Sequence, residues 1–174
     1  IYGNRGAELV DERSPRGEGF LSDVCVAWEA ATEPAREVGI RTVNLRTGVV
    51  LSAADGALKK MLPPFLVGVG GRLGDGRQFM SWISLDDLLG AVLHVLRRED
   101  IEGPVNAVAP NPVSNAEFTK TLGHVLSRPT FFAVPAAAAR LAFGEMADEM
   151  LLASTRVAPT RLEETNFAFG QEDL

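Results

Sequence analysis

Side chains suited to catalysis are sparse in this sequence, and the most conspicuous are two adjacent carboxylates, Asp86 and Asp87. Paired acids of this kind can serve as a general acid and a general base. They also follow Ser84 closely, and Ser-x-x-Asp is a capping box that places negative charge at the positive end of a helix dipole. We interpret both residues as helix-starting residues, with acid/base chemistry as the alternative.

The remaining candidates for nucleophilic or proton-transfer chemistry are the single cysteine, Cys25, and the two histidines, His94 and His124. A reactive cysteine needs a basic neighbour that lowers its pKa. The residues at helical spacing from Cys25 are apolar, small or acidic, so we expect a packed, inert thiol. The surroundings of both histidines predict solvent-facing side chains. Because no His, Cys or carboxylate cluster has ligand spacing, we expect no metal site.

Composition narrows the classes of function further. The chain has 174 residues, 46% of them hydrophobic, a net charge of −6 and three lysines. An acidic chain without a basic patch is not typical of a nucleic-acid-binding protein. No apolar run approaches the ~18 residues of a membrane span. One cysteine excludes an internal disulfide and favours a reducing cytoplasm, and the start at Ile1 without methionine suggests a portion of a longer protein.

Any functional site must be positioned by the helices and strands that the sequence predicts. Apolar spacing, caps and glycine stops predict helices over residues 20–38, 57–67, 84–98, 114–127, 135–156 and 159–169. Pro34 is expected to kink the first helix, Pro63 and Pro64 to break the second, and Gly144 to interrupt the fifth. Strands are predicted over residues 41–51, 79–83, 103–109 and 130–134, with loops over 1–19 and 68–76. This alternation favours an α/β fold with a parallel sheet.

Several motifs together resemble one family. They are Tyr2-Gly3, Leu45-Arg46-Thr47-Gly48-Val49-Val50, Phe79 to Leu89, and Val105-Asn106 followed by Ser114 to Phe118. The chain resembles the C-terminal half of extended short-chain dehydrogenase/reductases, the group of NAD(P)-dependent nucleotide-sugar epimerases and dehydratases. An atypical branch of these epimerases is matched by Val24 to Glu29, Lys60 to Phe65, Gly76 to Trp82, Ala109 to Val113 and Gly144 to Glu149.

The resemblance implies an architecture. It implies the C-terminal part of a Rossmann-like, doubly wound parallel sheet, with a smaller mixed substrate-binding lobe. On this reading, residues 1–56 complete the NAD(P)-binding domain, 57–134 form the mixed lobe with returning sheet segments, and 135–174 form a helical C-terminal segment specific to the family. The implied ligands are NAD or NADP and a small molecule, with a homodimer as the compatible assembly.

The resemblance also implies an altered reaction centre. The family's chemistry uses a Tyr-x-x-x-Lys pair, which corresponds here to Leu21 and Cys25. Neither residue can move a proton as the tyrosine does or hold the nicotinamide ribose as the lysine does. Two hypotheses follow. One is an epimerase-like oxidoreductase with non-standard catalytic residues, acting on a nucleotide-sugar or a related small carbonyl or hydroxy compound. The other is an inactive cofactor-sensing or scaffolding protein.

Site residues follow from the same resemblance, whereas no catalytic residue is identified. The cofactor is expected beside Leu45, Thr47, Gly48 and Val49, where ligands of open α/β sheets bind. The substrate is expected beside Met61, Arg72, Arg77, Gln78 and Trp82, since an arginine suits a phosphate or carboxylate and a tryptophan suits a ring. The alternatives are core packing for Trp82 and a surface loop for Arg77.

Overall fold

A computed structural model describes residues 1–144 and 147–174, so Glu145 and Met146 of the Gly144–Glu149 motif lie outside the described residues. The helices are α1 Phe20–Ala30, α2 Glu33–Glu37, α3 Ala57–Leu66, α4 Leu85–Arg97, α5 Asn115–Val125, α6 Ala136–Phe143 and α7 Thr160–Glu164, with a π-helical turn η1 at Ala147–Leu151. The strands are β1 Leu9–Val10, β2 Val43–Thr47, β3 Val49–Leu51, β4 Gly71–Leu73, β5 Phe79–Met80, β6 Trp82–Ser84, β7 Gly103–Ala107, β8 Val113–Ser114, β9 Phe132–Val134 and β10 Arg156–Val157. Within the described ranges, no helix is long and apolar enough to cross a membrane.

The predicted strand over residues 41–51 forms, with an interruption at Gly48. Its first part, β2, pairs in parallel with β7, and its second part, β3, pairs in parallel with β6. Gly48 marks the change of partner: its N–H donates to Ala107 O, and the next N–H, that of Val49, donates to Ser81 O. A Cβ on Gly48 would lie 2.8 Å from Ser81 O, so only glycine passes here without displacement. The α/β class with parallel pairing is confirmed.

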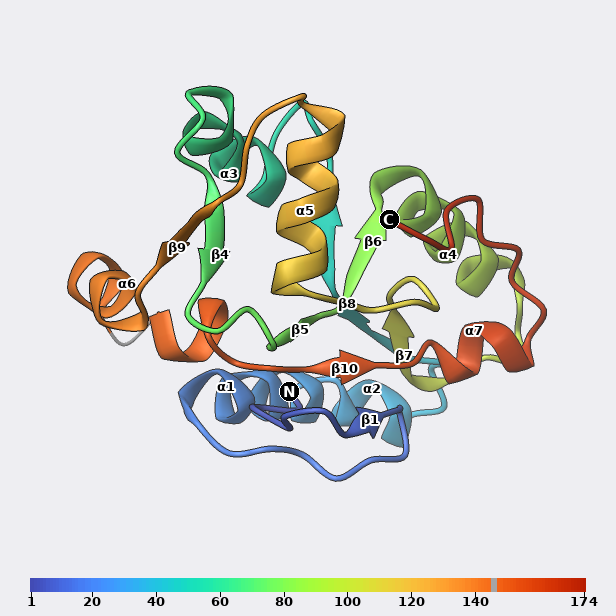
Figure 1. The fold of residues 1–174 in the computed structure, drawn as a ribbon. Coiled ribbons are helices and arrows are strands. Elements are labelled where there is room, and N and C mark those ends of the chain that lie inside the picture. Colours follow the sequence, from blue (N-terminus) through green and yellow to red (C-terminus); the bar gives the residue numbers. More distant parts are fainter. Residues whose placement is uncertain (145–146) are drawn as a thin grey trace.

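The predicted N-cap of α4 forms, and its capping box forms in part: the Ser84 hydroxyl accepts a hydrogen bond from the Asp87 N–H, while the Asp87 carboxylate accepts from the Ser84 hydroxyl and from the C-terminal tail. At α5, Ser114 and Glu117 form the complete predicted capping box. The inner face of α4 contributes Ala91 and Val95 to a buried cluster that also contains Val105 of β7. This packing places the sheet between α4 on one side and the segment that carries α1 and α2 on the other (Figure 1).

Two helix predictions are wrong in detail. The helix expected over residues 20–38 is split into α1 and α2, and Pro34 lies in the first turn of α2, where its missing N–H costs little. The break expected at Pro63 and Pro64 does not occur, because α3 continues through both. The carbonyls deprived of an N–H donor belong to Lys59 and Lys60, which are exposed to water.

Short strands in predicted loops and at the C-terminal end account for the other differences. Strand β1 lies within the predicted loop 1–19 and pairs in parallel with β10, while β4 lies within the predicted loop 68–76 and pairs with β9. The helix predicted over 135–156 ends at Gly144 and is followed by η1 and then β10. These two-residue and three-residue strands depend on distant partners, so local pattern alone does not reveal them.

Candidate functional site

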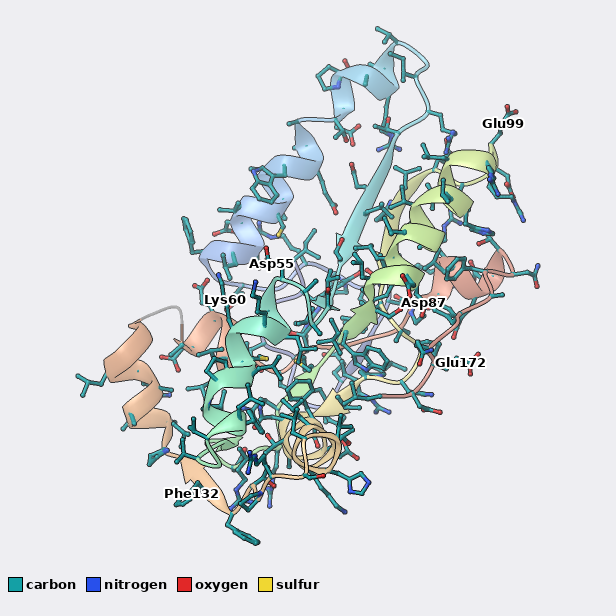
Figure 2. The ribbon with its side chains drawn as sticks, turned by 90° about the horizontal axis from the view of Figure 1, so that it is seen from above. Asp55, Lys60, Asp87, Glu99, Phe132 and Glu172 are labelled. Atoms are coloured by element: carbon teal, nitrogen blue, oxygen red, sulfur yellow. The ribbon has the colours of Figure 1, made fainter. Side chains whose placement is uncertain are left out.

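A cavity of about 1110 Å³ opens between α1, the end of β2, β3 and the segment that contains η1. Its lining includes side chains from both ends of the described chain, such as Tyr2 and Thr155. Strand β2 borders the cavity along its whole length, from Val43 to its carboxyl end at Thr47, and open α/β sheets place their ligands beyond that end. In Figure 2 the labelled Asp55, which is not part of the lining, lies between α1 and the start of α3.

Helix α1 supplies an apolar wall. Leu21, Cys25 and Trp28 all line the cavity, at the three-residue and four-residue spacing that puts side chains on one helix face. Leu21 and Cys25, the residues that the sequence predicts to stand in place of the family's Tyr-x-x-x-Lys pair, therefore face the cavity. Cys25 is a half-buried free thiol. This wall holds no proton-transferring pair of the family type.

The predicted cofactor residues lie together. Leu45, Thr47, Gly48 and Val49 all contribute to the lining. Thr47 is exposed at the carboxyl end of β2, whereas Leu45 and Val49 are half-buried and apolar. The arrangement offers an apolar surface with a single hydroxyl at its edge, which can contact an aromatic ring and hydrogen-bond one polar group.

The predicted substrate-binding residues fall into two groups, those that line the cavity and those that do not. Met61 and Gln78 line the cavity, but the Gln78 amide is already engaged, since its Nε2 donates to the carbonyls of Leu73 and Leu151 at 3.2 Å each. Arg72 and Arg77 are exposed and lie outside the lining. Trp82 is buried at 3% exposure, and its Nε1 donates to Asn111 O at 3.0 Å. The structure thus brings two of the five predicted residues to the cavity.

A charged network at the base of the cavity was not predicted from the sequence. Arg46 Nε and Nη2 donate to the two carboxylate oxygens of Glu29 at 2.7 and 2.8 Å, and Nη1 donates to the Tyr2 hydroxyl at 2.8 Å. Tyr2 in turn donates to Asn106 Oδ1 at 2.7 Å. Glu29 and Arg46 belong to quoted motifs on a predicted helix and strand, but their 17-residue separation gave no sign of a pair.

The network stabilises the charged form of Arg46. Burial opposes the Arg46 charge, but the hydrogen bonds with Glu29 and Tyr2 outweigh it and raise the pKa of Arg46 above its usual range. Burial also raises the pKa of Tyr2, although Arg46 opposes this effect. Tyr2 therefore stays protonated at neutral pH. Because its O–H donates to Asn106 and its oxygen accepts from Arg46, Tyr2 acts as a positioning group rather than as a proton donor to a ligand.

Two acidic side chains of η1, Asp148 and Glu149, line another side of the cavity. The Glu149 carboxylate accepts hydrogen bonds from the backbone N–H groups of Phe20 and Leu21 at 3.3 and 3.2 Å, at the start of α1. Asp148 pairs with Arg140 at 2.9 Å, and this pair lowers the pKa of Asp148. The four lining carboxylates are Glu18, Glu29, Asp148 and Glu149.

The other candidate residues, Asp87, His94 and His124, lie outside the cavity lining. Asp87 is buried, and its carboxylate accepts hydrogen bonds from the N–H groups of Gly170 and Gln171 at 2.7 and 2.9 Å, in addition to its capping role. His94 is half-buried, not solvent-facing as predicted, because Thr165 and Phe167 pack against it. His124 is exposed as predicted. Across residues 1–144 and 147–174, no group of three His, Cys, Asp or Glu side chains could hold a metal ion.

Known proteins share both the sequence and this architecture. A family model described as a domain of unknown function, DUF1731, matches residues 134–174. An epimerase family protein of Mycobacterium bovis is 51% identical over 173 residues, covering 99% of this chain and 58% of that protein.

Two solved structures extend the likeness to three dimensions. The crystal structure of human epimerase family protein SDR39U1 (isoform 2) with NADPH has a TM-score of 0.90 at 38% identity, covering 99% of this chain and 58% of that chain. The nucleoside-diphosphate sugar epimerase from Corynebacterium glutamicum has a TM-score of 0.80 at 40% identity, covering 99% and 33%. This chain spans 58% of the length of the M. bovis relative.

Proposed function

The chain belongs to the epimerase family proteins, whose C-terminal portion it matches, and from this premise we propose that it forms the substrate-facing part of an NAD(P)-binding oxidoreductase. The observation that carries the proposal is the cavity at the carboxyl end of β2, lined by Leu45, Thr47 and Val49. The human relative whose structure is similar was crystallised with NADPH. A dinucleotide of this class is therefore the cofactor proposed here.

The residues present fit the nicotinamide end of such a cofactor. Leu45 and Val49 supply apolar surface for one ring face, and the Thr47 hydroxyl can hydrogen-bond a polar substituent. Gly48 allows the strand to pass close to the Ser81 backbone at the cavity lining. When bound, the cofactor supplies or accepts a hydride. The chain's own residues then orient the ring, exclude water and position a carbonyl or hydroxyl carbon beside it.

A second candidate function rests on the α1 wall. Leu21 and Cys25 face the cavity where the family's tyrosine and lysine would act, and Tyr2 is committed to its network. This favours a cofactor-sensing protein without turnover as the alternative. Hydride transfer measured at 340 nm with small carbonyl compounds separates the two: turnover supports the oxidoreductase, and cofactor binding without turnover supports the sensor.

Calorimetric titration of NADPH and NADH into the natural polypeptide that carries this sequence tests cofactor binding. Thr47→Trp fills the cavity edge and is expected to weaken binding by about tenfold or more. Val38→Trp is the control, because Val38 is 74% exposed and does not line the cavity. Absence of binding at millimolar concentrations of either cofactor would contradict the proposal.

A further inference from the structure

The described part of the cavity lining carries more negative than positive charge, unlike a typical phosphate-binding site. Among the described residues that form the lining, Arg46 is the single cationic side chain, against four carboxylates. One edge of the Arg46 guanidinium, Nε with Nη2, is used by Glu29, and Nη1 donates to Tyr2. The positive charge of the single lining cation in the described part of the chain is therefore already compensated by a carboxylate.

The exposed cations nearby do not supply the missing charge. Arg72 and Arg77 are exposed and absent from the lining, and so is Lys60, although its neighbour Met61 faces the cavity. Figure 2 shows Lys60 projecting from α3. An anion held at a cavity edge by one flexible lysine gains little, since exposed ion pairs contribute about 0–1 kcal/mol.

The walls are correspondingly apolar. Apolar side chains line the cavity from four elements, namely Cys25 and Trp28 of α1, Met61 of α3, Val49 of β3 and Phe79 of β5. Neutral polar groups such as Thr47 and Asn115 are set among them. Moving a pyrophosphate into such surroundings removes its hydration without providing a cation, which is strongly unfavourable.

We propose that this cavity binds an uncharged, largely apolar compound that carries a carbonyl or hydroxyl group, and that it excludes nucleoside diphosphate esters. The proposal rests on the proposed function, in which the same cavity receives the substrate beside the nicotinamide ring. It narrows the substrate from the nucleotide-sugars implied by the family resemblance to a neutral class. The acidic groups further disfavour an anionic ligand, because Glu18 and Glu149 carry negative charge without an arginine or lysine partner in the described residues.

The test uses the natural polypeptide, with the neutral dye Nile red as the apolar probe and UDP-glucose as the anionic one. Nile red fluorescence is expected to rise and shift to the blue on binding, and 5 mM UDP-glucose is expected to leave it unchanged, that concentration being roughly the upper limit at which weak binding is meaningful. Displacement of the dye by micromolar UDP-glucose would overturn the inference.

A matched pair of variants locates the dye. Leu21→Glu puts a charge on the α1 wall and is expected to weaken Nile red binding by about tenfold. Leu141→Glu makes the same change on α6, where Leu141 is 91% exposed and lies outside the lining, and is expected to leave binding unchanged. Equal binding by both variants would overturn the inference. NADPH titration is read separately, so loss of cofactor binding counts against the proposed function alone.

Discussion

At the scale of single residues, the pair formed by Arg46 and Glu29 is the best-shielded ion pair among the described residues. Its side chains are 15% and 25% exposed. Truncating one partner leaves a charge partly buried without compensation, which is costlier than losing an exposed pair. The pair also fixes the rotamer of Arg46 and thereby the Tyr2 hydroxyl at the base of the cavity.

Glu29→Ala is therefore expected to lower the free energy of unfolding by about 1–3 kcal/mol, as measured by urea denaturation. Glu33→Ala removes the exposed pair with Arg36, whose side chains are 46% and 52% exposed, and is expected to cost less than about 0.5 kcal/mol. Equal effects of the two substitutions would show that Arg46 finds another partner.

His94 gives the chain a predictable dependence on pH. Burial lowers the pKa of His94 below its ordinary 6.5, and repulsion from Arg98 adds to this effect. The unfolded chain therefore binds the proton more readily than the folded chain, so the free energy of unfolding falls as pH is lowered through about 6.5. His94→Gln is expected to flatten this part of the stability profile, whereas His124→Gln at an exposed site is not. An unchanged slope in His94→Gln would contradict the assignment.

At the scale of elements, Asp87 joins the start of α4 to the C-terminal tail. Its carboxylate accepts from Ser84, Gly170 and Gln171, and in Figure 2 it lies at the start of the helix near the tail that carries Glu172. The tail also packs Phe167 and Phe169 against the cluster around Ala91. One acid therefore begins a helix and holds a distant segment against it.

Asp87→Ala is expected to lower the free energy of unfolding by about 2 kcal/mol and to speed amide exchange at Gly170 and Gln171, because the hydrogen bonds that its carboxylate accepts from Ser84, Gly170 and Gln171 are lost together. Asp86→Ala at the exposed neighbouring position removes only a favourable dipole interaction, worth about 0.3–1 kcal/mol. Unchanged exchange at Gly170 in the Asp87 variant would contradict the role assigned to the tail contact.

Sequence reasoning succeeded where the signal is local. The caps at Ser84 and Ser114 were predicted because they depend on residues three positions apart, and the strand over 41–51 because its β-branched residues are contiguous. Strand β10 and the Arg46–Glu29 pair were missed because each exists only through a partner far along the chain. The match of Leu21 and Cys25 to the family's Tyr-x-x-x-Lys pair stays a prediction, and their facing the cavity required coordinates.

At the scale of the whole molecule, the two ends of the described chain interlock. Strand β1 pairs with β10, and Glu12 Oε1 accepts from the N–H groups of Asn106 and Arg161 at 2.9 and 3.2 Å. The cavity inherits this arrangement, because Tyr2 and Thr155 line it together. The proposed division into residues 1–56, 57–134 and 135–174 stays a prediction, and these contacts favour cooperative unfolding of the three parts.

In the proposed function, the cavity beside α1 and the end of β2 receives the nicotinamide end of a cofactor. Hydrogen–deuterium exchange of the natural polypeptide, with and without saturating NADPH, detects such binding at the level of single segments. We predict slower exchange in residues 20–30 and 45–50, with residues 85–97 of α4, which do not line the cavity, unchanged as the internal control. Unaltered exchange at residues 20–30 and 45–50, or protection confined to α4, would contradict the claim.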